Sequence, residues 1–253
     1  MTAFAHYPSL NNRLVLITGG ASGIGASLVE HFHAQGSRVV FLDKDVEKAN
    51  NLVEKLSHSA SPPDFFYCDL SNISQLKTVI SEIIARMGNI AVLINNAGND
   101  QRHETLELDE KQWRDIQAIN LDQQFFAAQS VIPGMINNGG GAIINMSSVC
   151  FLRATAHYIG YSTAKAAIIG LTHSLAKEFG IYNIRVNSLL PGWVMTPKQI
   201  ERWLTPEAEA EWLQGQSLKQ KIMPEDIARA ALFLAADDSR MISKLNMIVD
   251  GGC

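Results

Sequence analysis

The stretch Thr18-Gly19-Gly20-Ala21-Ser22-Gly23-Ile24-Gly25 decides the fold of this 253-residue chain. An apolar run, Leu14–Thr18, precedes the glycines, and a helical pattern, Ile24–Gln35, follows them and stops at Gly36. Glycine is needed where the backbone turns sharply and where a side chain would block phosphates. The amino end of a helix offers free N–H groups and a partial positive charge. The stretch therefore predicts a cradle for a dinucleotide pyrophosphate, although its Gly-x-x-x-Gly-x-Gly spacing is looser than the G-x-G-x-x-G fingerprint.

The same alternation of strand and helix continues along the chain. Short β-branched, almost continuously apolar runs are separated by longer helical patterns, which is typical of a parallel sheet covered by helices on both faces. No linker, repeat or low-complexity tract divides the sequence, so one domain over residues 1–253 is expected. We predict an α/β fold, a Rossmann-like doubly wound parallel sheet of seven strands with helices on both faces. The expected strands are Leu14–Thr18, Arg38–Leu42, Phe65–Cys68, Val92–Asn95, Ala142–Met146, Arg185–Leu189 and Asn246–Val249.

Composition narrows the partners and the compartment. Acidic and basic residues are mixed and the net charge is −4, which argues against nucleic acid or an anionic membrane as a partner. Cys68, Cys150 and Cys253 are widely spaced and lack metal-ligand spacing, so reduced thiols and no metal site are expected. The stretch Met1–Asn12 lacks the pattern of a secretory signal, and no apolar run reaches the ~20 residues of a membrane helix. We therefore expect a soluble cytoplasmic protein.

Residues 194–223 fit the alternation poorly. This connection carries Trp203, Trp212, Thr205-Pro206 and many charges, without a strand pattern. Long connections of this kind often form lids over sites. Two interpretations remain open, a substrate lid and an ordinary helical hairpin on the surface.

An acidic residue, Asp43, follows the second expected strand, about twenty residues beyond the glycines. A carboxylate there accepts hydrogen bonds from the adenosine ribose and repels a 2′-phosphate, which favours NAD over NADP. No Arg or Lys precedes Gly23, where Ser22 stands, so one usual anchor for that phosphate is missing. Lys44 is a neighbouring cation that offsets part of the repulsion. Alternatively, Asp43 caps the following helix.

Tyr161 and Lys165 are four residues apart, so on a helix they share one face. A free phenol has a pKa of about 10, and a nearby ammonium together with the positive nicotinamide ring lowers it by favouring the phenolate. Such a pair also occurs by chance on solvated helices. Ser148, however, comes just after the expected strand Ala142–Met146, at the edge where open α/β sheets bind ligands. Together the three residues predict proton transfer at an alcohol or carbonyl.

The chain resembles the single-domain short-chain dehydrogenases/reductases along nearly its whole length. Ser148 precedes Tyr161 by thirteen residues, as the catalytic serine of that family does. The other matching elements are Thr18–Gly25, Asp69, Asn95-Asn96-Ala97-Gly98, Asn120, Lys165, Pro191-Gly192 and Asp250-Gly251-Gly252.

The resemblance implies a role for each motif. Tyr161 acts as the acid/base on the substrate hydroxyl, Lys165 holds the nicotinamide ribose and lowers the tyrosine pKa, and Ser148 binds the substrate oxygen. Asn120 kinks its helix and holds a water between Lys165 and solvent, a role that its sequence position alone does not suggest. The implied cofactor-binding residues, with Asp69 and Leu70 at the adenine, are Gly19, Ser22, Gly23, Ile24, Gly25, Asp43, Asp69, Leu70, Asn96, Ala97, Gly98, Tyr161, Lys165, Pro191, Gly192, Val194 and Thr196.

A narrower similarity is to bacterial pentose and hexose 1-dehydrogenases of the D-xylose and L-arabinose type. Those enzymes oxidise the anomeric hydroxyl of a cyclic sugar to an aldonolactone with NAD. Such a site needs polar groups to read several hydroxyls. The stretch Asn99–His103 supplies them, unless Asp100–His103 form a salt-bridged structural loop instead. The shared stretches are Tyr7-Pro8-Ser9-Leu10, Asn95–Asp100, Arg102-His103, Thr205-Pro206-Glu207 and Leu218-Lys219.

The substrate side departs in part from the polar pattern of a sugar site. Cys150, Phe151, Leu152 and Arg153 are expected to reach the pocket, and they are more apolar than a sugar requires. Trp193 would stack on the apolar face of a sugar or on a steroid or aryl ring. The implied substrate-binding residues are Asn99, Gln101, Arg102, His103, Ser148, Cys150, Arg153, Tyr161 and Trp193.

Three functions follow from these motifs. An NAD-dependent sugar or polyol dehydrogenase is favoured, and a 3-oxoacyl or ketone reductase or secondary-alcohol dehydrogenase is the alternative. A non-catalytic dinucleotide sensor would be expected to lack Tyr161 or Lys165. The resemblance also implies a homotetramer, joined through helices at Asp109–Ile136 and Tyr161–Phe179. In the second helix, Ile168, Ile169, Leu171, Leu175 and Phe179 serve either the core or that interface.

Overall fold

One parallel sheet of seven strands runs through the computed structural model, which describes residues 4–58 and 61–253. The first three residues of the stretch Met1–Asn12, assessed above for a secretory signal, lie outside the described residues. The strand order is β3-β2-β1-β4-β5-β6-β7, and every neighbouring pair is parallel. The strands are β1 Leu14–Thr18, β2 Arg38–Asp43, β3 Asp64–Tyr67, β4 Val92–Asn95, β5 Gly141–Met146, β6 Ile184–Pro191 and β7 Asn246–Val249.

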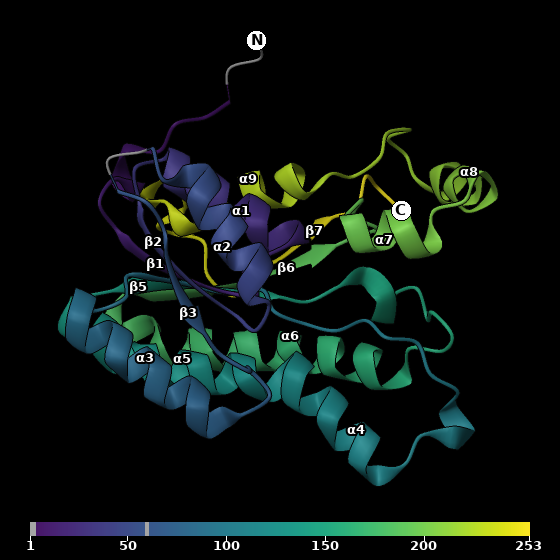
Figure 1. Cartoon of the computed structure of the whole chain (residues 1–253), viewed down its shortest axis with the longest axis horizontal. Helices are drawn as coiled ribbons and strands as arrows, with labels where there is room; N and C mark the ends of the chain where they lie inside the picture. Colours follow the sequence, from purple (N-terminus) through teal and green to yellow (C-terminus); the bar gives the residue numbers. More distant parts are fainter. Residues whose placement is uncertain (1–3, 59–60) are drawn as a thin grey trace.

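Helices cover both faces of the sheet, as the sequence predicts (Figure 1). Helices α1, α2 and α9 pack over one face, and α3, α5 and α6 pack over the other. The helices are α1 Gly23–Ala34, α2 Val46–Leu56, α3 Ile73–Met87, α4 Glu110–Gln117, α5 Gln123–Asn137, α6 Ile159–Phe179, α7 Pro197–Trp203, α8 Pro206–Gly215 and α9 Pro224–Ala235. The fold is therefore a single Rossmann-like α/β domain.

Alternation along each strand divides the core into two layers. In β1, Val15 and Ile17 join the core under α1 and α9, while Leu14 and Leu16 join the core under α3 and α5. Successive side chains of a strand point to opposite faces. All five residues of β1 are buried, which explains why its sequence is continuously apolar.

Strands β2, β5 and β6 extend by one or two residues beyond one or both ends of their predicted ranges, and two other predicted elements need a larger correction. The third strand is predicted at Phe65–Cys68 but spans Asp64–Tyr67, because it lies at the sheet edge and its register is set by pairing with β2 alone. The long helix predicted at Asp109–Ile136 is not continuous. A π-helix at Ala118–Asp122 separates α4 from α5. It contains Asn120, so the helix is irregular at the residue to which the resemblance assigns the kink.

The strand order reverses between β1 and β4. From β1 the chain moves outward to β2 and β3, and from β4 it moves the other way to β5, β6 and β7. Open parallel sheets bind ligands beyond the carboxyl ends of the strands at such a switch point. The glycine stretch follows β1 and the Asn96-Ala97-Gly98 motif follows β4, so the fold places both motifs there.

Candidate active site

A single cleft of about 1570 Å³ lies along the carboxyl edge of the sheet. It collects residues from the loops after β1, β2, β3, β4 and β5 and from the long connection between β6 and α9. All the implied catalytic, cofactor-binding and substrate-binding residues line it: Gly19, Ser22, Gly23, Ile24, Gly25, Asp43, Asp69, Leu70, Asn96, Ala97, Gly98, Asn99, Gln101, Arg102, His103, Asn120, Ser148, Cys150, Arg153, Tyr161, Lys165, Pro191, Gly192, Trp193, Val194 and Thr196.

The glycine loop is shaped so that none of its four glycines, Gly19, Gly20, Gly23 and Gly25, accepts a side chain without a shift. Gly19 and Gly23 have φ of +67° and +56°, a region that favours glycine. A Cβ on Gly19 would lie 2.9 Å from Ala97 Cα, and one on Gly25 would overlap the carbonyl oxygen of Gly19. The main chain is therefore open toward the cleft at the amino end of α1. This geometry fits a dinucleotide pyrophosphate, whose charge suits that helix end.

Side chains from two strand ends hold this loop in place. Asn96 Nδ2 donates to the carbonyl oxygens of Thr18 and Gly19 at 3.0 Å each, and Asn96 N donates to Thr18 Oγ1 at 3.0 Å. Asp43 Oδ2 accepts a hydrogen bond from Ala21 N at 2.9 Å. These bonds join β1, β2 and β4 around the cradle, so the three motifs form one unit.

Asp43 does not cap the helix that follows it. Asp45 is the N-cap of α2 and accepts from Lys48 N, whereas Asp43 Oδ1 accepts from Asp45 N at 3.0 Å. The Asp43 carboxylate thus braces the loop on both sides and lines the cleft beside Lys44. Of the two sequence interpretations, the structure supports a carboxylate presented to the cleft.

At the far end of the cofactor side, Asp69 lies in the turn after β3. Its carboxylate accepts from Ser71 Oγ at 2.6 Å and from Ser71 N at 3.1 Å. The hydrogen bond from the Ser71 hydroxyl lowers the pKa of Asp69, and the Lys44 charge acts in the same direction. Leu70 is buried beside it and supplies an apolar wall.

Tyr161 and Lys165 lie one turn apart on α6, as predicted. The Lys165 ammonium lies 5.3 Å from the centre of the Tyr161 ring and donates to the Met146 carbonyl oxygen at 2.8 Å. Burial lowers the pKa of Lys165 to about 8. Removal of the phenol from water raises the pKa of Tyr161 above its usual range, and a hydrogen bond with Ser148 opposes this increase. In the protein itself burial thus outweighs the lowering that the sequence suggests, so that lowering requires the added positive charge of a bound nicotinamide and stays a prediction.

Asn120 is fully buried within the π-helix and is held by the main chain. Its Nδ2 donates to the carbonyl oxygens of Asn99 at 3.1 Å and Ile116 at 3.0 Å, and its Oδ1 accepts from Asn99 N at 2.8 Å. A Cβ on Gly98 would lie 3.0 Å from Asn120 Oδ1 and 3.3 Å from Lys165 Nζ. Asn120 thus ties the loop after β4 to the helical segment that joins α4 and α5.

The substrate side consists of aromatic and charged side chains in contact. Arg102 Nε donates to the Tyr158 hydroxyl at 2.9 Å, and the guanidinium lies 3.8 Å from the centre of the Trp203 ring. Arg153 lies over Trp212 at 4.1 Å, and Trp212 meets Trp193 edge-on at 5.6 Å between ring centres. Arg102 and Arg153 come from loops after β4 and β5, whereas Trp203 and Trp212 belong to α7 and α8.

Helix α7 is also bound to the loop after β4. Asp100 accepts from Lys198 Nζ at 2.5 Å and from Gln199 Nε2 at 2.6 Å. Gln199 Oε1 in turn accepts from Trp193 Nε1 at 2.9 Å. The segment 194–223 therefore folds as two short helices whose residues line the cleft.

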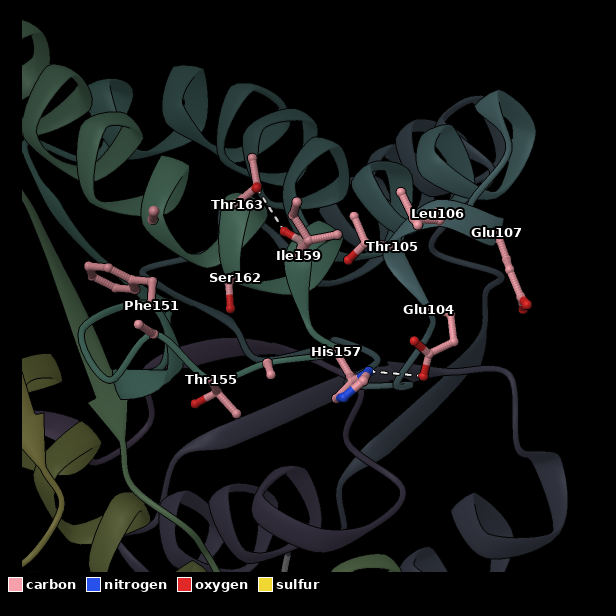
Figure 2. Close-up of a pocket in the computed structure, with 13 residues that line it drawn as sticks. Glu104, Thr105, Leu106, Glu107, Phe151, Thr155, His157, Ile159, Ser162 and Thr163 are labelled. Atoms are coloured by element: carbon pink, nitrogen blue, oxygen red, sulfur yellow. Dashed lines mark hydrogen bonds and ion pairs between the residues drawn. The ribbon is translucent and has the colours of Figure 1, made fainter.

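Two residues expected in the pocket lie elsewhere. Phe151 lines a separate hollow of about 820 Å³, together with Leu106, Thr155 and Ile159 (Figure 2). Leu152 is 56% exposed and lines neither cavity. The short 3₁₀ helix Val149–Phe151 turns the chain so that Cys150 and Arg153 face the cleft and Phe151 does not. Phe151 and Leu152 therefore do not contribute to the lining of the cleft beside Ser148, whereas Cys150 and Arg153 do.

Sequence reasoning missed several residues that build the cleft. Tyr158, Lys198, Gln199, Trp203 and Trp212 line it but are absent from the predicted set, although the last four fall in the predicted lid. Their contacts join residues about a hundred positions apart, such as Asp100 and Lys198. No local pattern reports such a pairing.

The described residues give no sign of a metal or membrane site. Within residues 4–58 and 61–253, no group of three His, Cys, Asp or Glu side chains is arranged to hold a metal ion. In the same ranges, every helix is too short or too polar to cross a membrane.

Comparison with known proteins identifies the family. The family model described as enoyl-(acyl carrier protein) reductase matches residues 19–253. A probable galactose dehydrogenase of Rhizobium meliloti is 43% identical over 249 residues, which are 98% of this chain and 97% of that protein. D-xylose 1-dehydrogenase of Caulobacter vibrioides is 43% identical over 248 residues, 98% of each chain. This chain belongs to the short-chain dehydrogenase/reductase family.

A solved member has the same fold. The aldohexose dehydrogenase of Thermoplasma acidophilum, in ligand-free form, superposes with a TM-score of 0.86 at 29% identity, covering 97% of this chain and 95% of its own. As a short-chain dehydrogenase/reductase, the protein is an oxidoreductase that uses a nicotinamide dinucleotide. The cradle at Gly19–Gly25 and the cleft beside it fit such a cofactor.

Proposed function

We propose that this short-chain dehydrogenase oxidises the anomeric hydroxyl of a cyclic aldose to an aldonolactone, with NAD as the hydride acceptor. The observation that carries the proposal is the convergence of Ser148, Tyr161 and Lys165 beside the glycine cradle, in one cleft whose substrate side combines charged, polar and aromatic residues. The proteins named as galactose and D-xylose 1-dehydrogenases, to which the chain is 43% identical, support a sugar as the substrate.

The residues that would hold NAD follow the cleft from end to end. The main chain at Gly19–Gly25 would bind the pyrophosphate, and Asp43 would accept from the adenosine ribose hydroxyls. Asp69 and Leu70 would contact the adenine, and Lys165 would donate to the nicotinamide ribose. Bound NAD supplies a hydride acceptor at its nicotinamide ring. The remaining contacts come from Ser22, Ile24, Asn96, Ala97, Gly98, Tyr161, Pro191, Gly192, Val194 and Thr196, which line the same cleft.

The protein's own residues handle the proton. Ser148 holds the anomeric oxygen, and Tyr161 takes the proton from that oxygen as the C1–H bond breaks. Because burial raises the pKa of Tyr161, the phenolate needs nearby positive charge, which the Lys165 ammonium helps to provide. Asn120 fixes the loop after β4 against these groups and holds a water that connects Lys165 to solvent.

Asp43 sets the preference for NAD over NADP. Its carboxylate is fixed by Ala21 N and Asp45 N, so it cannot turn away from a 2′-phosphate without losing both bonds. The Asp43 carboxylate and a 2′-phosphate beside it would both be negative, and like charges repel each other. Lys44 lowers the repulsion without removing it, and Ser22 offers no cation before Gly23.

The sugar is bound by the loops after β4, β5 and β6 and covered by residues 194–223 as a lid. Asn99, Gln101, Arg102 and His103 offer donors and acceptors from the loop after β4. Cys150 and Arg153 lie opposite them, and Trp193 offers an aromatic face. Carbohydrate hydroxyls need such paired polar groups, whereas the C–H face of a sugar stacks on an aromatic ring.

The enzyme works as a cytoplasmic homotetramer joined through the helical stretch Asp109–Ile136, which holds α4 and most of α5, and through α6. Ile168 and Leu175 are buried in the protein's own core, so they do not form the interface. The outer face of α6 instead exposes small residues, Thr163, Ala166, Ala167, Gly170 and Ser174, and Phe125 of α5 is 37% exposed. Small exposed residues let two helices approach closely.

A panel of aldoses, polyols and secondary alcohols tests the proposal. Each compound is mixed with NAD or NADP, and formation of the reduced cofactor is followed by absorbance. Turnover of pentoses or hexoses with NAD, lost in Tyr161→Phe, is expected. Turnover of ketones or simple alcohols only would assign the protein to the ketone reductases, and cofactor binding without turnover of any compound would favour a sensor.

A further inference from the structure

One main-chain oxygen at the end of β5 receives two side-chain donors. The carbonyl of Met146 accepts from Lys165 Nζ of α6 at 2.8 Å and from Gln124 Nε2 of α5 at 3.2 Å. Both donors are buried, Gln124 at 0% and Lys165 at 2% exposure. A carbonyl oxygen only accepts, so the amide nitrogen of Gln124, and not its oxygen, must face it.

A polar network holds the two donors at this point. Asn95 Nδ2 donates to the main-chain oxygen of Gln124 at 3.1 Å and to Asn145 Oδ1 at 2.9 Å. Asn145 Nδ2 donates to Thr172 Oγ1 at 3.0 Å, two turns beyond Lys165 on α6. The network thus fixes α5 and α6 against the ends of β4 and β5. Buried polar networks of this kind specify geometry more than they add stability, and this one leaves Asn95 Oδ1 and Gln124 Oε1 without a donor among the described residues.

Lys165 depends on this carbonyl. An ammonium has three donors, and the Met146 oxygen is its one recorded acceptor among the residues that the structure describes. The charged or titratable groups nearby come from three elements: Tyr161 on its own helix, Cys150 in the 3₁₀ helix after β5, and Asp100 in the loop after β4. Each of these three groups stays in place when Gln124 is changed.

We propose that Gln124 is a positioning residue for Lys165, which it controls by sharing the Met146 carbonyl oxygen. The amide occupies part of that oxygen, so the ammonium is bound more weakly than an unshared carbonyl would bind it. The weaker bond leaves Lys165 free to turn toward the cleft while its stem stays fixed in α6. The effect of these two hydrogen bonds on catalysis rests on the proposed function, but the shared Met146 carbonyl oxygen itself does not.

The state of Lys165 can be read without any cofactor or substrate. Protein labelled with ¹³C at the lysine ε-carbon is titrated by NMR, and the Lys165 signal is identified by its loss in Lys165→Arg. Gln124→Met keeps the side-chain length and removes the donor. Its matched control is Gln123→Met, because Gln123 is also fully buried but donates to the Ala97 oxygen at 3.1 Å.

The titration should distinguish the two variants by the pKa of Lys165. In the natural protein, burial lowers the pKa of Lys165 to about 8. Gln124→Met should raise it by about half a unit, because an unshared hydrogen bond favours the charged form. Gln123→Met should leave it unchanged. No change in Gln124→Met, or the same change in both variants, would overturn the proposal. Gln124→Asn, whose shorter side chain cannot reach the oxygen, answers the same question if Gln124→Met does not fold.

Kinetics then separates this proposal from the proposed function. With an aldose that the natural enzyme oxidises, Gln124→Met should move the basic limb of the kcat/KM profile to higher pH, and Gln123→Met should not. A limb that stays in place while the NMR midpoint moves would overturn the catalytic role of the sharing. If the natural enzyme oxidises no aldose, the proposed function fails, and the NMR result alone decides whether Gln124 controls Lys165.

Discussion

The two sides of the cleft are held together by different kinds of contact. The cofactor side consists of main chain and buried side chains, with Asn96 and Asp43 bonded to the glycine loop itself. The substrate side consists of long charged and aromatic side chains, such as Arg102 over Trp203, that join loops to the helices α7 and α8. The cofactor side is formed by the ends of the strands and the turns that follow them. The substrate side is formed by side-chain contacts between loops and the helices α7 and α8, which lie outside the sheet.

This difference separates what the fold requires from what the substrate requires. A bond to a main-chain atom in a buried turn cannot be lost without moving the turn. A contact between partly exposed charged side chains contributes little energy and can be exchanged. Changes on the cofactor side should therefore have large effects on binding and stability, and changes on the substrate side should act mainly through KM.

The largest effect is expected from Gly25→Ala. Its Cβ would overlap the Gly19 carbonyl oxygen, so the cradle must open. We expect the affinity for NADH to fall by about 100-fold, measured by fluorescence titration. Gly180→Ala is the matched control, because no atom lies within 4 Å of the added Cβ. Equal affinity in the two variants would contradict a rigid cofactor side.

Lys165→Met should stabilise the protein while it abolishes turnover. The folded pKa of about 8 lies below the ordinary lysine value of 10.5, so the unfolded chain binds more protons between these values. Burying the charged form therefore costs stability below pH 8, and this cost disappears as the pH rises toward 10.5. The variant should unfold with about 2 kcal/mol more free energy at neutral pH.

The pH dependence of that gain is the decisive part of the measurement. Denaturant unfolding of Lys165→Met and of the natural protein should differ most at pH 7 and converge as the pH rises. A difference that does not change with pH would mean that the buried charge is not its source.

Asp43→Asn should change the choice of cofactor by a smaller factor. The amide oxygen can still accept from Ala21 N, while the amide nitrogen cannot replace the acceptor for Asp45 N, and the negative charge is gone. The ratio of kcat/KM for NAD to that for NADP should fall about tenfold. An unchanged ratio would show that the carboxylate does not face the adenosine ribose.

The smallest effect is expected at the contact between Asp100 and Lys198. This ion pair is partly exposed, so Lys198→Met should raise KM for the substrate about threefold and leave kcat within about twofold. The control is Lys55→Met, which removes a surface ion pair between α2 and Glu30 of α1. Neither residue lines the cleft, so KM should stay unchanged. A large loss of kcat would show that the substrate side is as rigid as the cofactor side.

The same contrast explains how much the sequence predicts. Local patterns predict the seven strands, the helices on both faces and the cofactor motifs, since Thr18–Gly25 carries its own turn and helix start. Strand ends are less certain where pairing decides them, as in β3, which begins at Asp64 because that residue pairs with Val40 of β2.

The substrate side resists prediction because its contacts are distant in the sequence. Phe151 and Cys150 are neighbours, but a 3₁₀ turn sends them to different cavities. Gln124 carries no motif, and its contact with the Lys165 system exists only through a main-chain oxygen of another strand. Asn120 was suggested by family resemblance and not by its local pattern.

The central claim is that the hydride comes from C1 of an aldose, and isotopic labelling of that carbon tests it most directly. D-galactose and D-xylose deuterated at C1 are incubated with NAD and the natural enzyme, and the isolated NADH and sugar product are examined by mass spectrometry. The account predicts NADH that carries one deuterium and an aldonolactone that has lost it, with neither product formed by Tyr161→Phe. NADH without deuterium, or no oxidation of either aldose, would contradict it.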